Sequence, residues 1–148
     1  MDEPLHLATD RFAQGFNCAQ SIFAAFSAKL GLPSELALRV AAPFGAGMGR
    51  AGETCGALSG ALMVLGLQHV GNRPEYKEEI YAITRDFVAR FQQRNGTTLC
   101  RELVGYDIST PEGLRAAREN NAFAKICPLI VEDTAQALSK YLNEHPAK

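Results

Sequence analysis

Four cysteines are the residues of this 148-residue chain best suited to chemistry: Cys18, Cys55, Cys100 and Cys127. Thiolates attack disulfides, and they also bind iron and zinc. No two of these cysteines form a Cys-x-x-Cys pair, which excludes a thioredoxin-type motif and a short-spaced zinc knuckle. A shared chemical role therefore requires a fold that brings distant thiols together. Otherwise each one packs as a small buried hydrophobe.

The segment around Cys55 is rich in glycine and reads GMGRAGETCG. Gly47, Gly49 and Gly52 have the spacing of a dinucleotide-binding loop, but that motif needs a strand before it and an acidic residue at a later strand end. Here a helical segment and Pro43 come before the glycines, and no Gly-Lys-Ser/Thr follows them. The pattern therefore favours a loop that presents a thiol over one that binds a nucleotide.

All four cysteines are predicted to lie in the cap or first turn of a helix. Asn17 and Thr54 are candidate N-caps directly before Cys18 and Cys55. Cys100 opens a short helix, and Cys127 precedes Pro128, where the last helix is predicted to begin. The free N–H groups and the dipole at a helix N-terminus stabilise a thiolate. Functional thiols are therefore favoured over inert ones.

Three glycines near Cys55 are candidates for close contact with a cofactor or with another helix. Gly52, Gly56 and Gly60 are four residues apart, so the last two share one face of the predicted helix. A glycine inside a helix costs about 1 kcal/mol relative to alanine, so a compensating close approach is expected. Helix packing alone explains the spacing, and contact with a cofactor is also compatible with it.

The composition is that of an ordinary globular protein. Fifteen basic and sixteen acidic residues nearly cancel, which speaks against nucleic acid as a partner. The N-terminal residues lack the basic start and apolar core of a signal peptide, and no apolar run is long enough to span a membrane. A cytoplasmic location is expected, where structural disulfides are rare.

The elements that must position the thiols are helical almost throughout. Apolar residues recur at steps of three and four, and no segment alternates long enough for a strand. The sequence predicts a single all-α domain over residues 1–148, a bundle of about six to seven helices around a central, apolar, glycine-rich helix. The longer predicted helices cover residues 5–16, 18–30, 54–70, 74–95, 110–120 and 128–142, and short helices are predicted over residues 34–42 and 99–104. The small-residue faces are compatible with a homodimer.

The motif Cys55-Gly56-Ala57-Leu58-Ser59-Gly60 matches Cys-Gly-Ala-x-x-Gly. With Cys18 before it and Cys100 and Cys127 after it, the chain resembles the C_GCAxxG_C_C family of four-cysteine proteins, which are described as redox-active. A related domain occurs in split-Soret cytochromes, for which iron–sulfur binding has been suggested. The chain has no Cys-x-x-Cys-His for haem attachment, so only the cysteine part of that relationship carries over.

The first hypothesis is a redox protein, a candidate thiol–disulfide oxidoreductase, whose cysteines gather in one pocket and carry out thiol–disulfide exchange or electron transfer with an unknown redox partner. Cys55 is the expected attacking thiol because its helix start looks the most accessible, and Cys100 or Cys127 would resolve the mixed disulfide. The second hypothesis is a metal-binding module in which Cys18, Cys55, Cys100 and Cys127 hold an iron–sulfur cluster or zinc. The third is a structural or interaction protein with inert thiols.

Overall fold

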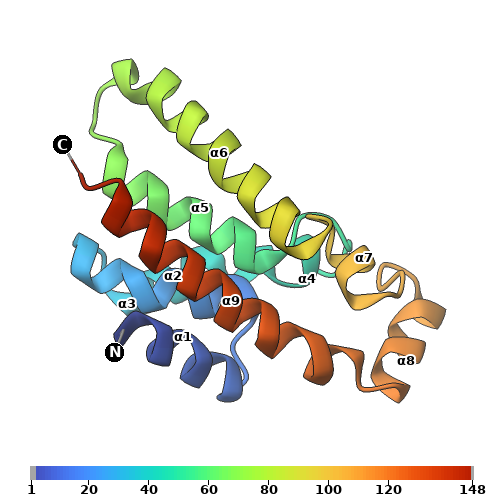
Figure 1. The fold of residues 1–148 in the computed structure, drawn as a ribbon. Coiled ribbons are helices and arrows are strands. Elements are labelled where there is room, and N and C mark those ends of the chain that lie inside the picture. Colours follow the sequence, from blue (N-terminus) through green and yellow to red (C-terminus); the bar gives the residue numbers. More distant parts are fainter. Residues whose placement is uncertain (1–2, 148) are drawn as a thin grey trace.

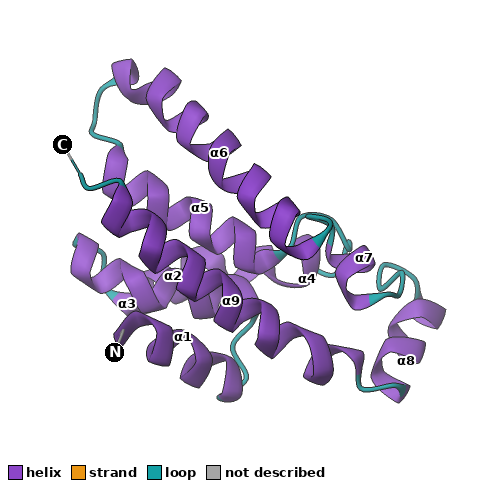
Figure 2. Ribbon diagram, in the orientation of Figure 1, coloured by secondary structure: helices purple, strands orange, loops and turns teal. Residues whose placement is uncertain are grey.

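The computed structural model describes residues 3–147, so residues 1, 2 and 148 at the ends of the predicted domain lie outside the description. Helices dominate, and no described residue belongs to a named strand (Figure 2). The all-α prediction is confirmed, and seven of the α-helices have eight or more residues. In chain order the α-helices are α1 (Glu3–Ala13), α2 (Cys18–Ser27), α3 (Ser34–Ala41), α4 (Gly45–Met48), α5 (Gly56–His69), α6 (Lys77–Asn95), α7 (Cys100–Val104), α8 (Pro111–Glu119) and α9 (Ala122–Glu144).

Helices α2 and α5 pack against each other at the centre of the bundle. Most residues of both helices are buried, and α5 is apolar on all sides, as its sequence predicts. A side chain at Gly60 of α5 would lie 2.8 Å from the carbonyl oxygen of Ala19 and 3.1 Å from Cβ of Ile22. The two helices therefore approach closely because Gly60 has no side chain, which confirms the packing explanation for its spacing.

Helices α1, α3, α6 and α9 surround this central pair (Figure 1). The long helix α6 lies along α5, and α9 crosses the bundle on the side of α1. The ring of Phe87 on α6 meets the ring of Tyr141 on α9 edge-on at 5.4 Å between centroids. The phenol of Tyr141 donates a hydrogen bond to Asp86 at 3.0 Å.

A second, smaller apolar cluster lies at one end of the molecule, where α7 and α8 extend beyond the bundle (Figure 1). Its buried members are Cys100, Val104, Ile108, Ala117 and Ala122. The first turns of α9 form part of this cluster, while the rest of α9 packs into the main core. The boundary between the two clusters is where the cysteines meet.

Two predicted helix starts are wrong. The last helix begins at Ala122 and continues through Pro128, because Ala122 and Phe123 pack into the second cluster and hold its first turns in place. Cys127 therefore lies inside α9, where no free N–H groups of a helix start are available to it. Thr54 does not cap α5 either, since Cys55 occupies the cap position and Thr54 pairs with Leu99 in an isolated antiparallel bridge.

Within residues 3–147 no helix combines the length and the apolar character required to cross a bilayer.

Candidate thiol site

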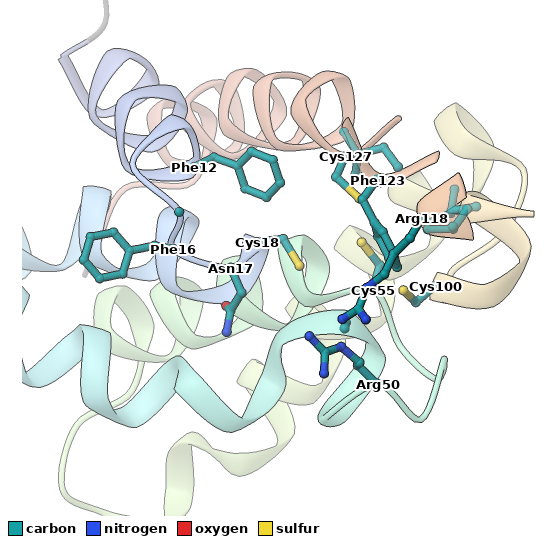
Figure 3. Close-up of a pocket in the computed structure, with 15 residues that line it drawn as sticks. Phe12, Phe16, Asn17, Cys18, Arg50, Cys55, Cys100, Arg118, Phe123 and Cys127 are labelled. Atoms are coloured by element: carbon teal, nitrogen blue, oxygen red, sulfur yellow. The ribbon is translucent and has the colours of Figure 1, made fainter. Parts of the chain in front are cut away.

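All four cysteines line one cavity of about 290 Å³ between the two apolar clusters (Figure 3). Cys18 and Cys55 belong to the main core, and Cys100 and Cys127 to the second cluster. Cys18 and Cys127 are partly buried, whereas Cys55 and Cys100 are only 6% and 7% exposed. All four are free thiols. The fold thus gathers residues that are far apart in the sequence around one small space.

Cys18 is placed by a capping box at the start of α2. The Asn17 side chain accepts a hydrogen bond from the backbone N–H of Gln20 at 2.9 Å, and the Gln20 side chain accepts one from the backbone N–H of Asn17 at 3.0 Å. The Asn17 amide also donates to the carbonyl of Ala42 at 2.9 Å, which ties this helix start to the segment after α3. Asn17 is therefore the predicted N-cap, and it fixes Cys18 as the first helical residue.

A left-handed turn lies directly beside Cys18. Five consecutive residues have positive φ: Ala46 (54°), Gly47 (65°), Met48 (69°), Gly49 (61°) and Arg50 (69°). The left-handed conformation costs about 1–2 kcal/mol for each residue with a side chain, so three of these positions are strained. Contacts on both sides hold the turn. The N–H of Gly49 donates to Gly45 at 2.9 Å, and a side chain at Gly47 would lie 2.8 Å from Cβ of Cys100.

The sulfur of Cys18 is surrounded by hydrogen-bond donors. The Cys55 thiol donates to it, as do the backbone N–H groups of Ala46, Ala19 and Cys18 itself. These donors, led by Cys55, lower the pKa of Cys18 to about 6 against the opposing effect of burial. The same hydrogen bond and burial raise the pKa of Cys55 well above its ordinary value. The contact therefore favours the thiolate form at Cys18 and the thiol form at Cys55.

The accessibility of Cys18 and Cys55 differs from what the sequence predicts. Cys55 was predicted to be the accessible thiol of the site, and that prediction is wrong because Cys55 is buried in the main core and its backbone N–H bonds to Thr98. Cys18 is the more exposed of the two and the one with the lowered pKa. The left-handed turn that brings the N–H of Ala46 to its sulfur has no recognised sequence signature.

The other two cysteines are protonated neighbours of this pair. Burial raises the pKa of Cys100 to about 11 and that of Cys127 to about 12, and the negative charge of Cys18 adds to both shifts. Cys127 gains nothing from a helix start because it lies within α9. Because the charge on Cys18 raises both pKa values, the pKa values of Cys100 and Cys127 should fall when that charge is lost.

A pair of backbone hydrogen bonds aligns the starts of α5 and α7. The N–H of Cys55 donates to the carbonyl of Thr98 at 2.8 Å, and the N–H of Cys100 donates to the carbonyl of Glu53 at 2.7 Å. Thr54 and Leu99 are the bridge partners between them. This clasp, residues 53–55 with residues 98–100, sets both thiols against the same cavity.

The three predicted glycines lie close to the site, and none of them lines the cavity formed by the described residues. A side chain at Gly56 would collide with the sulfur of Cys18, so Gly56 makes room for that sulfur. Gly60 lies against the backbone of α2. Gly52 has φ of +72°, and a side chain there would lie 3.1 Å from Cβ of Arg101.

The cysteines do not form a ready-made metal site. A tetrahedral zinc or iron site requires four ligands about 2.3 Å from one ion. Among residues 3–147, no three side chains of histidine, cysteine, aspartate or glutamate lie close enough together to hold a metal ion. As they lie in this structure, the described thiols therefore do not form a preformed site for a single zinc ion.

Several residues of the site have no motif that would reveal them in the sequence. Phe12, Phe16 and Phe123 form apolar walls of the cavity. Arg50 and Arg118 lie at its edge, from the left-handed turn and from the end of α8 (Figure 3). The helical periodicity accounts for the phenylalanines as packing residues. Nothing in the local sequence of α8 indicates that Arg118 faces a cysteine cavity.

The chain was compared with protein families, curated proteins and solved structures. Residues 16–141 match the profile of a family described as "Putative redox-active protein (C_GCAxxG_C_C)". The matched range includes all four cysteines and the glycines around Cys55. No match was found among curated proteins or among solved structures.

Proposed function

Because the chain belongs to the C_GCAxxG_C_C family, described as redox-active, we propose that it carries out thiol–disulfide exchange through Cys18 and Cys55. The observation that supports this most directly is that Cys18 and Cys55 line the same cavity, where the Cys55 side chain lowers the pKa of Cys18. Exchange needs one thiolate that attacks and one neighbouring thiol that resolves. Cys18 would supply the attacking thiolate and Cys55 the resolving thiol, and the two side chains interact with each other.

In the first step, the Cys18 thiolate attacks one sulfur of a substrate disulfide. A new bond forms between Cys18 and that sulfur, the substrate S–S bond breaks, and the other half leaves as a thiolate. The attack removes the negative charge on Cys18 that held the pKa of Cys55 high. Cys55 can then lose its proton to the departing thiolate.

In the second step, the Cys55 thiolate attacks Cys18 in the mixed disulfide and releases the second half of the substrate. The two protein thiols are oxidised to a disulfide, and the substrate disulfide is reduced to two thiols. A dithiol or small-thiol reductant returns the protein to its starting state. Run in reverse, the same steps oxidise a substrate dithiol.

This proposal is tested by trapping the intermediate. We expect reduced protein treated with bis(2-hydroxyethyl) disulfide to form a Cys18–Cys55 disulfide, identified by peptide mass spectrometry after acid quenching. Cys55→Ser should stop at a mixed disulfide on Cys18, and Cys18→Ser should form neither product. Cys127→Ser is the matched control and should still form the Cys18–Cys55 disulfide.

Two results would contradict the proposal. One is unchanged reaction of the Cys18→Ser variant, and the other is a disulfide that maps to Cys100 and Cys127 in the wild-type protein. Metal analysis of protein purified without oxygen tests the alternative, since one equivalent of zinc or an iron–sulfur absorbance lost in Cys18→Ser would make the cysteines metal ligands.

A further inference from the structure

Two arginines from separate elements lie at the edge of the thiol cavity. Arg50 is the last residue of the left-handed turn at residues 46–50, which overlaps α4, and Arg118 is the penultimate residue of α8. Both are exposed, and their guanidinium groups approach the same part of the cavity (Figure 3). The fold thus brings two cations to the opening above Cys18 although they are far apart in the sequence.

Neither guanidinium takes part in an ion pair among residues 3–147. Other arginines of the chain do: Arg90 pairs with Asp86, Arg94 with Asp133 and Arg101 with Glu53. No aspartate or glutamate lines the cavity. The cavity therefore has two uncompensated positive charges in a protein whose net charge is −1.

The rest of the cavity is apolar. Phe12, Phe16 and Phe123 supply its walls, and the nucleophile Cys18 is partly buried among them. A volume of about 290 Å³ is close to the lower end of the range for small-molecule sites, which begins at about 300 Å³. A compact molecule can bring a sulfur to Cys18 in this space, whereas the flat surface of a folded partner cannot.

Arg50 is held at this opening at an energetic cost. Its φ of +69° is a conformation that glycine, asparagine and aspartate adopt more readily. Strained backbone of this kind persists where surrounding contacts require it and is concentrated at ligand sites. The turn that holds Arg50 is also the turn whose Ala46 N–H donates to the Cys18 sulfur, so the cation and the nucleophile are positioned by one element.

We propose that this cavity binds a small disulfide bearing oxyanion groups such as carboxylates, with Arg50 and Arg118 holding those groups while Cys18 attacks the disulfide. The guanidinium group matches a carboxylate with two parallel N–H donors, which orients as well as attracts. The inference rests on the exchange reaction proposed above and adds its substrate class. The bonds and protons are those of that reaction: the Cys18–substrate bond replaces the substrate S–S bond, and the leaving thiolate takes the Cys55 proton.

The test compares three disulfides of similar size and different charge: dianionic 3,3′-dithiodipropionate, neutral bis(2-hydroxyethyl) disulfide and dicationic cystamine. The rate constant for reaction of each disulfide with Cys18 is measured by acid quench and mass spectrometry. It is then divided by the rate constant for reaction of the same disulfide with 2-mercaptoethanol. Each protein is described by the ratio of the dianionic to the neutral value. This ratio cancels differences in Cys18 ionisation between variants.

For the wild-type protein we expect the order dianionic, neutral, dicationic, from fastest to slowest. Arg50→Gln and Arg118→Gln should each lower the ratio about fivefold, the effect of one unit charge at about 4 Å in water. Arg85→Gln is the matched control, because this exposed arginine of α6 lies outside the cavity and its loss changes the net charge equally. Its ratio should equal that of the wild type.

Failure of this inference and failure of the exchange reaction give different results. If Cys18 reacts with none of the three disulfides, the exchange reaction itself is wrong. If Cys18 reacts with all three and the ratio is the same in wild type, Arg50→Gln and Arg118→Gln, exchange stands and the anionic substrate class is overturned. An equal fall in Arg85→Gln would also overturn it, because net charge alone would then explain the preference.

Discussion

Replacing Cys55 with alanine tests whether a hydrogen bond between two thiols controls the reactivity of the site. A pKa lowered from 9.0 to about 6 corresponds to about 4 kcal/mol of preference for the Cys18 thiolate. Four donors share this stabilisation against the opposing effect of burial, and Cys55 contributes most. Its share is therefore at least about 1 kcal/mol, so Cys55→Ala should lower the acid dissociation constant of Cys18 at least about fivefold.

The assay is the rate of Cys18 alkylation by iodoacetamide as a function of pH, read by mass spectrometry of the Cys18 peptide. We expect the midpoint of the wild-type profile near pH 6 and a higher midpoint in Cys55→Ala. Cys55→Ser keeps a donor and should remain closer to the wild type. Cys127→Ala removes a thiol from the same cavity that does not donate to Cys18, so its midpoint should stay near the wild-type value. Identical midpoints in wild type and Cys55→Ala would refute the role given to this hydrogen bond.

Three further predictions concern stability, each measured by urea unfolding under reducing conditions. Gly60→Ala should lower the free energy of unfolding by about 1–3 kcal/mol because the new side chain would meet the Ala19 backbone. Gly66→Ala on the same helix places a side chain with nothing within 4 Å and should raise the free energy of unfolding by up to about 1 kcal/mol. Shifts of the same sign in both variants would contradict the close packing. The lowered pKa of Cys18 means that its ionisation stabilises the fold fully above pH 9 and that this contribution is lost as the pH falls through about 6. The excess stability of wild type over Cys18→Ala should therefore grow between pH 6 and 8 by up to about 1.4 kcal/mol per pH unit, and a flat difference would disprove it. Thr110→Ala removes the side-chain oxygen that accepts a hydrogen bond from the Gly113 N–H at 3.0 Å, and it should lower the free energy of unfolding by about 1 kcal/mol. An unchanged unfolding midpoint would show that this cap contributes nothing.

Features that depend on local chemistry can be predicted from the sequence of this protein. The N-cap predicted at Asn17 is observed, and the helices predicted to end at residues 95 and 104 end there, directly before Gly96 and Gly105. Each of these residues acts on backbone groups within a few positions, so its effect does not depend on the rest of the fold. The helical class and the buried central helix follow in the same way from the spacing of apolar residues.

Features that depend on distant contacts could not be predicted. Pro128 lacks the N–H that a helix interior uses and is therefore a strong signal for a helix start. In the structure, α9 continues through it because the residues before it pack into the second cluster. The left-handed turn at residues 46–50 and the approach of Arg118 to the cavity likewise require contacts between segments far apart in the chain.

The clasp between residues 53–55 and 98–100 has a consequence for how this protein can be joined to other molecules. The chain leaves the clasp along α5 and returns along α6, and the hairpin turns around residues 71–73, which are exposed and lie far from the clasp (Figure 1). The entropy of closing a loop rises only slowly with its length, so a peptide tag or a whole fluorescent domain inserted at Asn72 should leave the clasp closed. Attachment to a surface, a reporter or a second enzyme is therefore possible at the end of the hairpin opposite the thiols.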